Sequence, residues 1–239
     1  MEWLVSQYSR ILLKLSGQVM AGQNAFGIDA ERVKTLAGEV AEVAAAGVQV
    51  GLVLGAGNFF RGVAAAAREM NRVTADQMGM LATLINSLAL EDQLEKLGVP
   101  ARVLSAIQMN QVCEPYIVRR ALRHLDKGRV VICAGGTSNP YFSTDTGAAL
   151  RALELRAQVI AKATRVDGVY DQDPLKHPGA VLFREISYHE VLAKALGVID
   201  ASAVAMCRDN NLPIIVFNLN VRGNIMRMTM GEPIGTLIH

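Results

Sequence analysis

Two lysines stand near the ends of apolar segments, where a charged side chain is uncommon. Lys14 lies within the segment 10–15 and Lys162 within 158–163, and both segments are typical of buried strands. An ammonium group this deep in an apolar run needs an anion or a water-filled cleft, because burying an unpaired charge is unfavourable. Either lysine alone could instead extend to solvent at a sheet edge. Two such lysines on different strands favour an anion-binding site.

A glycine-rich loop follows another predicted strand, 48–54. Gly55 and Gly57 would let backbone amides approach an anion closely, and Arg61 carries a planar guanidinium suited to phosphate. A dinucleotide-binding fingerprint would need a third glycine where Phe60 stands, and the sequence contains no GxxxxGK[ST] motif. The segment therefore predicts a phosphate-binding loop of another kind, with an ordinary glycine-rich turn as the alternative.

A polar loop follows the apolar run 130–133. Its hydrogen-bonding side chains are those of Thr137, Ser138, Asn139, Ser143 and Thr144, and Tyr141 and Phe142 would form apolar walls. Asp145 is predicted to cap the helix 146–155, since its carboxylate could accept from the following amides. Ligands bind at the carboxyl ends of strands in parallel sheets, so the loop is a candidate binding loop. The alternative is a turn rich in small polar residues.

A long helix is predicted from a cap at Thr74 to about Leu97. Asp76 would then lie in the first turn, where the helix dipole favours a carboxylate, so a capping role is the simpler interpretation. The alternative is that Asp76 accepts from a hydroxyl group of a substrate.

The predicted elements alternate between strand and helix, which indicates an α/β fold with a mostly parallel sheet and helices on both faces. The further strands are expected at 102–105, 213–217 and, as a final edge strand, 234–238. The further helices are expected at 29–47, 115–125, 187–196 and 201–208.

The composition predicts a single soluble domain. The chain has 239 residues, of which 51% are hydrophobic and 19% charged, and a net charge of +2 with no basic stripe, so no nucleic-acid partner is expected. Three widely spaced cysteines predict reduced thiols in the cytoplasm. The uncharged window 43–60 is interrupted by glycines, and with no signal peptide evident we expect no membrane association.

Several segments together resemble the bacterial uridylate kinases of the amino acid kinase family. They are KLSG at 14–17, FGID at 26–29, GAGNFFRG at 55–62, NRVTADQMGMLAT at 71–83, GGTSNPYFSTD at 135–145, KATRVDGVYDQDP at 162–174 and GEPIGTLI at 231–238. The resemblance implies a three-layer α/β/α sandwich formed by one domain, 1–239, with an acceptor-binding part at roughly 1–150 and an ATP-binding part at roughly 151–239. It also implies transfer of the ATP γ-phosphate to UMP, giving UDP and ADP, in pyrimidine nucleotide biosynthesis.

The resemblance assigns roles to individual residues. Lys14 and Lys162 would reach the transferring phosphate. Asp145 would orient them and the metal region, a role that competes with capping or accompanies it. The implied ATP-binding residues are Lys14, Leu15, Ser16, Gly17, Gly57, Arg61, Thr164, Tyr170 and Asp173. The implied UMP-binding residues are Ala56, Arg61, Asp76, Thr137, Ser138, Asn139, Pro140, Tyr141, Phe142, Ser143 and Thr144. Mg²⁺ would be carried mainly by the ATP phosphates, with no protein metal site.

The resemblance also implies a homo-oligomer, a hexamer. The helix predicted at 74–97 has more apolar residues than one covered face needs, which suggests a second partner, although another part of the same chain could cover them. These residues include Leu84, Ile85, Leu88, Ala89 and Leu90. Some relatives respond to GTP as activator and UTP as inhibitor, and Glu91 and Glu95 stand where basic residues serve GTP activation, so neither response is carried over.

Small departures from the family pattern affect the expected acceptor site. Ala56 and Ser138 replace glycines, Ser143 replaces threonine, and Gln18 replaces glutamate. They bear on acceptor affinity more than on activity. The alternative functions are another amino acid kinase that makes an acyl phosphate, and a nucleotide-binding homologue without turnover.

Overall fold

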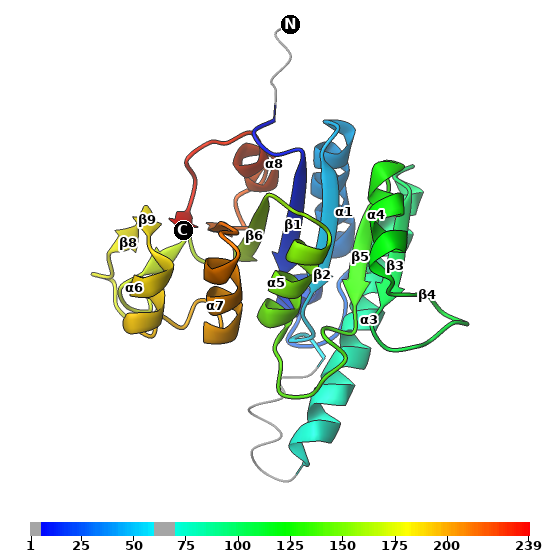
Figure 1. The fold of residues 1–239 in the computed structure, drawn as a ribbon, viewed down its shortest axis with the longest axis horizontal. Helices are drawn as coiled ribbons and strands as arrows, with labels where there is room; N and C mark the ends of the chain where they lie inside the picture. The colour runs from blue at the N-terminus through cyan, green and yellow to red at the C-terminus, as the bar shows by residue number, and fades with distance from the viewer. Residues whose placement is uncertain (1–5, 60–69) are drawn as a thin grey trace, which may run out of the picture.

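The structure, a computed structural model, describes residues 6–59 and 70–239 and is built around one large sheet (Figure 1). In the described chain this sheet has nine strands in the order β4-β3-β5-β2-β1-β6-β10-β11-β9. Its strands are β1 (Arg10–Leu15), β2 (Gln49–Leu54), β3 (Ala101–Ser105), β4 (Glu114–Pro115), β5 (Val130–Ala134), β6 (Val159–Thr164), β9 (Glu185–Ile186), β10 (Ile214–Asn218) and β11 (Thr236–Ile238). A separate antiparallel pair comprises β7 (Val169–Tyr170) and β8 (Leu182–Phe183).

The large sheet is parallel except where β11 runs antiparallel to β10. The expected strand near the C-terminus exists, but its predicted place at the edge is wrong. β11 lies between β10 and the two-residue strand β9, which forms the edge instead. A strand as short as β9 carries too little pattern to be predicted from its residues.

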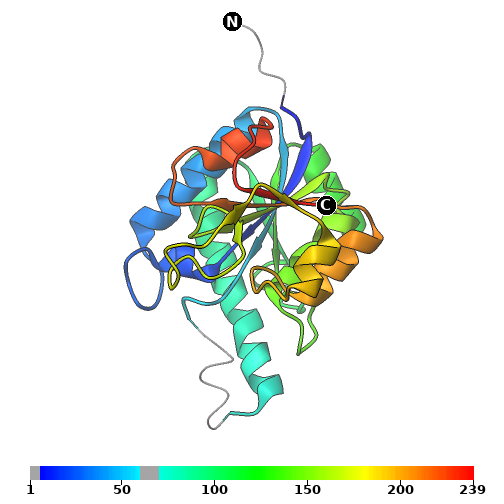
Figure 2. The ribbon, with the colours of Figure 1, turned by 90° about the vertical axis from the view of Figure 1, so that its left-hand side faces the viewer.

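Helices cover both faces of the sheet, as Figure 2 shows, with blue α1 and red α8 on one side and yellow α6 and orange α7 on the other. One layer comprises α1 (Ala30–Ala45), α3 (Arg72–Lys96) and α8 (Asn224–Thr229). The other comprises α4 (Val118–Asp126), α5 (Thr144–Glu154), α6 (Tyr188–Ala193) and α7 (Ala201–Asp209). A short 3-10 helix, η1 (Gly17–Ala21), follows β1.

The central strand β1 shows why the sequence forms three layers. Ile11 and Leu13 belong to the core beneath α1 and α3, whereas Leu12 belongs to the core beneath α5 and α7. Alternate side chains of a strand point to opposite faces, so a strand covered on both faces is apolar throughout. The expected α/β/α sandwich is confirmed.

Two of the three helix caps predicted by residue are wrong. Asp29 does cap α1, accepting from the amide of Arg32 at 3.0 Å. The long helix, however, is capped by Asn71 and begins at Arg72, so Thr74 lies inside it. The cap of α5 is Ser143, whose hydroxyl accepts from the amides of Asp145 and Thr146, and Asp145 lies in the first turn.

Two further expectations concern the cysteines and the membrane. The three cysteines are free thiols. Among the helices of residues 6–59 and 70–239, none is long and apolar enough to cross a membrane.

Candidate functional site

Lys14 and Lys162 are direct neighbours in the sheet. β1 and β6 are parallel, and their register pairs Lys14 with Lys162. Both residues follow the alternation that places Leu12 beneath α5, so both ammonium groups lie on the α5 face near the carboxyl ends of their strands. The two lysines that the sequence placed on different strands therefore form one cationic pair.

Asp145, in the first turn of α5, lies between the two lysines. Its Oδ1 is 2.5 Å from Nζ of Lys14, and its Oδ2 accepts from Nζ of Lys162. All three side chains are about nine-tenths buried. Ser143 supplies the helix cap, so the carboxylate of Asp145 is available to hold two like charges side by side.

The pKa values of this triad follow from burial and charge. Burial alone would raise the pKa of Asp145, but the charges of Lys14 and Lys162 and their hydrogen bonds hold it below its ordinary value. Burial, and then the charge of Lys14, lower the pKa of Lys162 to about 8, although Asp145 opposes this shift. Taken by itself, the triad of two lysines and one carboxylate thus carries a net positive charge, which suits it to an anion.

Asp200 joins this site and was not predicted. It precedes α7 at the cap position, yet its side chain does not cap that helix and instead accepts from the hydroxyl of Ser143. Burial, and then the charge of Asp145, raise the pKa of Asp200, while the two lysines oppose the shift. A place directly before a helix is typical of a capping residue, and nothing local in the sequence indicates that this carboxylate meets Ser143 instead.

The loops that follow β1 and β2 are in close contact. The amide of Gly55 donates to the carbonyl of Leu15 at 2.8 Å. A Cβ atom on Gly17 would lie 2.5 Å from the carbonyl oxygen of Gly55 and the amide nitrogen of Gly57, which backbone atoms cannot accommodate. Gly17 is therefore required by this approach, and Leu15, fully buried, presents only its backbone. Ser16 lies between Leu15 and Gly17 in the chain. Arg61, predicted for both nucleotides, lies outside the described residues.

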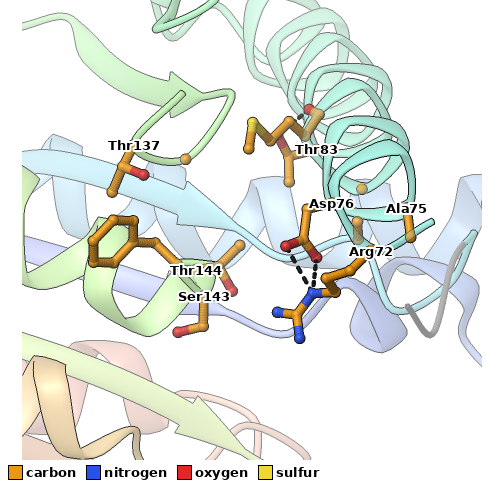
Figure 3. Close-up of a pocket in the computed structure, with 12 residues that line it drawn as sticks. Arg72, Ala75, Asp76, Thr83, Thr137, Ser143 and Thr144 are labelled. Atoms are coloured by element: carbon orange, nitrogen blue, oxygen red, sulfur yellow. Dashed lines mark hydrogen bonds and ion pairs between the residues drawn. The ribbon is translucent and has the colours of Figure 1, made fainter. Parts of the chain in front are cut away.

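A cavity of about 260 Å³ lies between α3 and the loop that follows β5 (Figure 3). Six residues predicted for the acceptor line it: Ala56, Asp76, Thr137, Phe142, Ser143 and Thr144. The remaining loop residues predicted for the acceptor are absent from this lining: Ser138, Asn139, Pro140 and Tyr141. Arg72 and Thr83 also line the cavity and were missed, although both share the helix α3 with Asp76.

Asp76 connects α3 to the loop. It forms an ion pair with Arg72, one helical turn earlier, at 2.8 Å, and its Oδ2 accepts from the amide of Tyr141 at 2.7 Å. Because α3 begins at Arg72, the predicted place of Asp76 in the first turn is wrong, and its carboxylate serves the cavity wall rather than a helix cap. The ring of Tyr141 lies beneath the guanidinium of Arg72, at 5.3 Å from its centre.

A second cavity, of about 450 Å³, lies beside the β7–β8 pair. Tyr170 and Asp173 line it, together with the segment 194–198 that follows α6. Thr164 ends β6, and its hydroxyl donates to the carbonyl of Val166 at 2.7 Å. The predicted ATP-binding residues near 170 therefore share a cavity at the carboxyl-terminal side of β6.

Comparison with known proteins gives consistent matches. A model of the amino acid kinase family matches residues 9–218. The UMP kinase from Bacillus anthracis superposes with a TM-score of 0.93 at 39% sequence identity, covering 97% of this chain and 96% of that chain. The UMP kinase from Ureaplasma parvum gives 0.90 at 35% identity, with 97% and 99% covered. The uridylate kinase from Archaeoglobus fulgidus gives 0.74 at 28% identity, with 96% and 99% covered.

Proposed function

The chain belongs to the amino acid kinase family, and on that premise we propose that it transfers the γ-phosphate of ATP to UMP, giving ADP and UDP. The observation that carries the proposal is the buried triad of Lys14, Lys162 and Asp145. Ser143 and Thr144, the two residues before Asp145, line the cavity beside α3. The likeness to UMP kinases extends over nearly the whole chain, which supports the proposal.

The reaction needs positioning and charge neutralisation. An oxygen of the UMP phosphate attacks the γ-phosphorus of ATP, and the bond from that phosphorus to the bridging oxygen of ADP breaks. Negative charge is spread over the transferred group in the transition state. Lys14 and Lys162 stabilise this charge from a fixed place, and Asp145 keeps their ammonium groups directed into the site. A strong general base is unnecessary, because the acceptor oxygen is already anionic.

ATP is proposed to lie along the loops after β1 and β2. Backbone amides at Leu15, Ser16, Gly17 and Gly57 would meet its phosphates. Thr164, Tyr170 and Asp173 would meet the adenosine part, since two of them line the larger cavity. Arg61 remains a prediction for both nucleotides.

UMP is proposed to occupy the cavity beside α3. Ala56 and Arg61 would lie at its phosphate, Asp76 at its ribose, and the loop from Thr137 to Thr144 around its base. Asp76 can accept from ribose hydroxyls while it retains its bond to the loop. The guanidinium of Arg72 adds positive charge to the same cavity.

The residues present are compatible with Mg²⁺ bound through the nucleotide. Among the described residues no group of three or more His, Cys, Asp or Glu side chains could hold a metal. Mg²⁺ binds through one or two carboxylates plus substrate phosphates, and Asp200 offers a carboxylate that no lysine pairs directly. The ion would neutralise charge on the ATP phosphates, with Asp200 as its protein partner.

The proposed reaction belongs to pyrimidine nucleotide synthesis in the cytoplasm.

The proposal does not assign an activator or inhibitor to this chain. Glu91 accepts from the amide of Val103 at 2.9 Å, and Glu95 pairs with Arg102 at 2.7 Å, so acidic groups occupy this part of α3.

A homo-oligomer, the hexamer implied by the resemblance, is proposed on the exposed face of α3. Leu84 and Leu90 are buried within the chain itself, so they do not support an interface, whereas Met78, Leu81 and Ile85 form an exposed apolar row. Their spacing of three and four residues places them on one face of the helix. A second copy of this helix is the proposed occupant.

A coupled assay of ADP formation tests the function directly. Purified protein with Mg-ATP is given UMP, CMP, dUMP or acetylglutamate as acceptor, and we expect turnover with UMP well above the others. Acetylglutamate as the preferred acceptor would indicate an acyl-phosphate kinase. Binding of ATP and UMP without ADP formation would indicate a homologue without turnover.

A further inference from the structure

The buried face of α3 carries two polar side chains that reach two different loops. The hydroxyl of Thr83 accepts from the amide of Gly135 at 2.9 Å. One turn later, the side-chain amide of Asn86 donates to the carbonyl of Gly55 at 2.8 Å. Gly55 follows β2 and Gly135 follows β5, and these strands are neighbours in the sheet. One helix thus holds the first residue of both loops.

The contact to Gly55 is part of a buried amide pair. Asn86 donates to Oδ1 of Asn58 at 2.8 Å, and Asn58 donates back to Oδ1 of Asn86 at 2.9 Å. Asn58 also donates to the carbonyl of Gly27 at 2.8 Å. Each side-chain NH₂ group therefore bonds one amide oxygen and one backbone carbonyl. Both side chains are almost fully buried: Asn58 is 2% exposed and Asn86 is 0% exposed.

These contacts involve atoms that are costly to bury without partners. A buried amide or carbonyl left unpaired destabilises the site, whereas apolar residues could have filled the space between α3 and the sheet. Thr83 also donates its proton to the carbonyl of Met80 at 2.6 Å, so the orientation of its hydroxyl is determined within its own helix. These polar groups therefore fix the positions of the two loops relative to α3, in addition to filling the space between the helix and the sheet.

We propose that Thr83, Asn86 and Asn58, which we call the α3 clamp, are positioning residues that set the distance between the two substrate loops. The inference rests on the proposed function, since it assigns the loop after β2 to the phosphates and the loop after β5 to the acceptor. Phosphoryl transfer depends on the alignment of the two reacting groups, and a misplacement of about 1 Å can lower a rate by about 10². The clamp acts through these loops: Thr83 also lines the cavity, but its hydroxyl is engaged by the amide of Gly135 and the carbonyl of Met80.

The test compares variants that differ by single groups. Thr83→Val replaces the hydroxyl with a methyl group of similar size, Thr83→Ser keeps the hydroxyl, and Asn86→Leu removes the amide pair. Ser87→Ala is the matched control, because within residues 6–59 and 70–239 this buried hydroxyl of α3 bonds only the carbonyl of Thr83. Thr229→Val is a second control, because it removes a buried helical hydroxyl in α8, away from α3 and the two loops. For each protein we would measure kcat, both KM values, the unfolding temperature, and binding of UMP and of a non-hydrolysable ATP analogue separately.

The clamp predicts a loss of turnover that exceeds any loss of binding. Thr83→Val and Asn86→Leu should lower kcat by about 10², while each ligand alone binds within about threefold of wild type. Thr83→Ser and both controls should stay within about threefold in kcat. Equal kcat in Thr83→Val and Ser87→Ala would overturn the proposal, as would an equal loss in Thr83→Ser and Thr83→Val.

The design separates this inference from the proposed function. If wild type uses an acceptor other than UMP, the assignment to UMP fails, and the same variants are measured with that acceptor, where the clamp still predicts the loss. If Asn86→Leu does not fold, Thr83→Val against Thr83→Ser decides. A chain that transfers phosphate to no acceptor would overturn both.

Discussion

The two lysines of the triad occupy equivalent places on neighbouring strands, so the same effect is expected from each. Each ammonium faces Asp145, and each would face the transferred phosphate. Replacement of either lysine with Met should lower kcat by about 10² or more, the scale for losing a preorganised electrostatic contact. Steady-state kinetics would measure this, with circular dichroism to verify folding. Normal turnover in a variant that folds poorly would show that the lysine is structural.

The lowered pKa of Lys162 predicts a pH dependence. In the free enzyme this ammonium loses its proton as the pH rises past about 8, so kcat/KM should fall above that pH by about tenfold per unit. The anionic phosphates of bound ATP favour the charged lysine, so the alkaline limb of kcat should lie at higher pH. The corresponding Lys162→Arg variant should show no limb near pH 8, because a guanidinium keeps its proton there.

The same shift has the opposite effect on stability. The pKa of Lys162 in the folded chain, about 8, lies below the ordinary value of 10.5. Between these two values the unfolded chain binds more protons, so the contribution of Lys162 to the free energy of unfolding rises with pH in this window. Activity and this contribution should therefore change in opposite directions from pH 8 to 10.

At the scale of the elements, the acceptor loop contains residues in an unfavourable backbone conformation. Ser138 has φ of 64° and Tyr141 has φ of 72°, a region that glycine adopts far more readily than other residues. The family resemblance implies glycine at this position, where the chain has Ser138. Its hydroxyl has no role in the cavity lining, so the loop shape rather than the side chain determines this position.

The Ser138→Gly variant should therefore be more stable by about 1 kcal/mol, the usual difference for a left-handed residue. Urea unfolding without ligands would measure the change. Asn139→Gly is the neighbouring control, at a residue without positive φ, and it should be less stable than wild type. If Ser138→Gly lost as much stability as Asn139→Gly, the left-handed conformation of Ser138 would not be a source of strain.

At the scale of the whole molecule, α3 would join two functions through its opposite faces. Its buried face carries Thr83 and Asn86, and its exposed face carries Met78, Leu81 and Ile85. A partner on the exposed face would therefore contact the same helix that holds both substrate loops.

The Leu81→Glu variant tests the assembly. A carboxylate buried at the centre of a helix pair has no partner there, so the oligomer should dissociate. Light scattering at micromolar concentration would report the mass. Val181→Glu is the control, since Val181 is also an exposed apolar residue but lies outside α3. A wild-type protein that is fully active as a 25.7 kDa monomer would contradict the oligomer and this interpretation of α3.

The sequence by itself determined the alternation of strands and helices, and it predicted that two strand lysines would meet an oppositely charged group. Apolar periodicity depends on residues close along the chain, so strands such as 10–15 and 158–163 were visible locally. The two lysines needed an anion or a water-filled cleft wherever their strands lay, unless they reached solvent at a sheet edge, because an unpaired buried ammonium is unfavourable in any fold. The motifs that carry the family resemblance were likewise contiguous.

Only the tertiary structure decided which side chains meet. Ser143 and Asp145 were both able to cap α5, and the approach of Lys14 and Lys162 from the sheet gave the carboxylate of Asp145 its different partners. The turn of Asp200 toward Ser143 has no local signal. The division of the apolar residues of α3 into buried and exposed faces depends on how the helix lies against the sheet. Each of these outcomes is set by contacts between residues far apart in sequence, which no local pattern specifies.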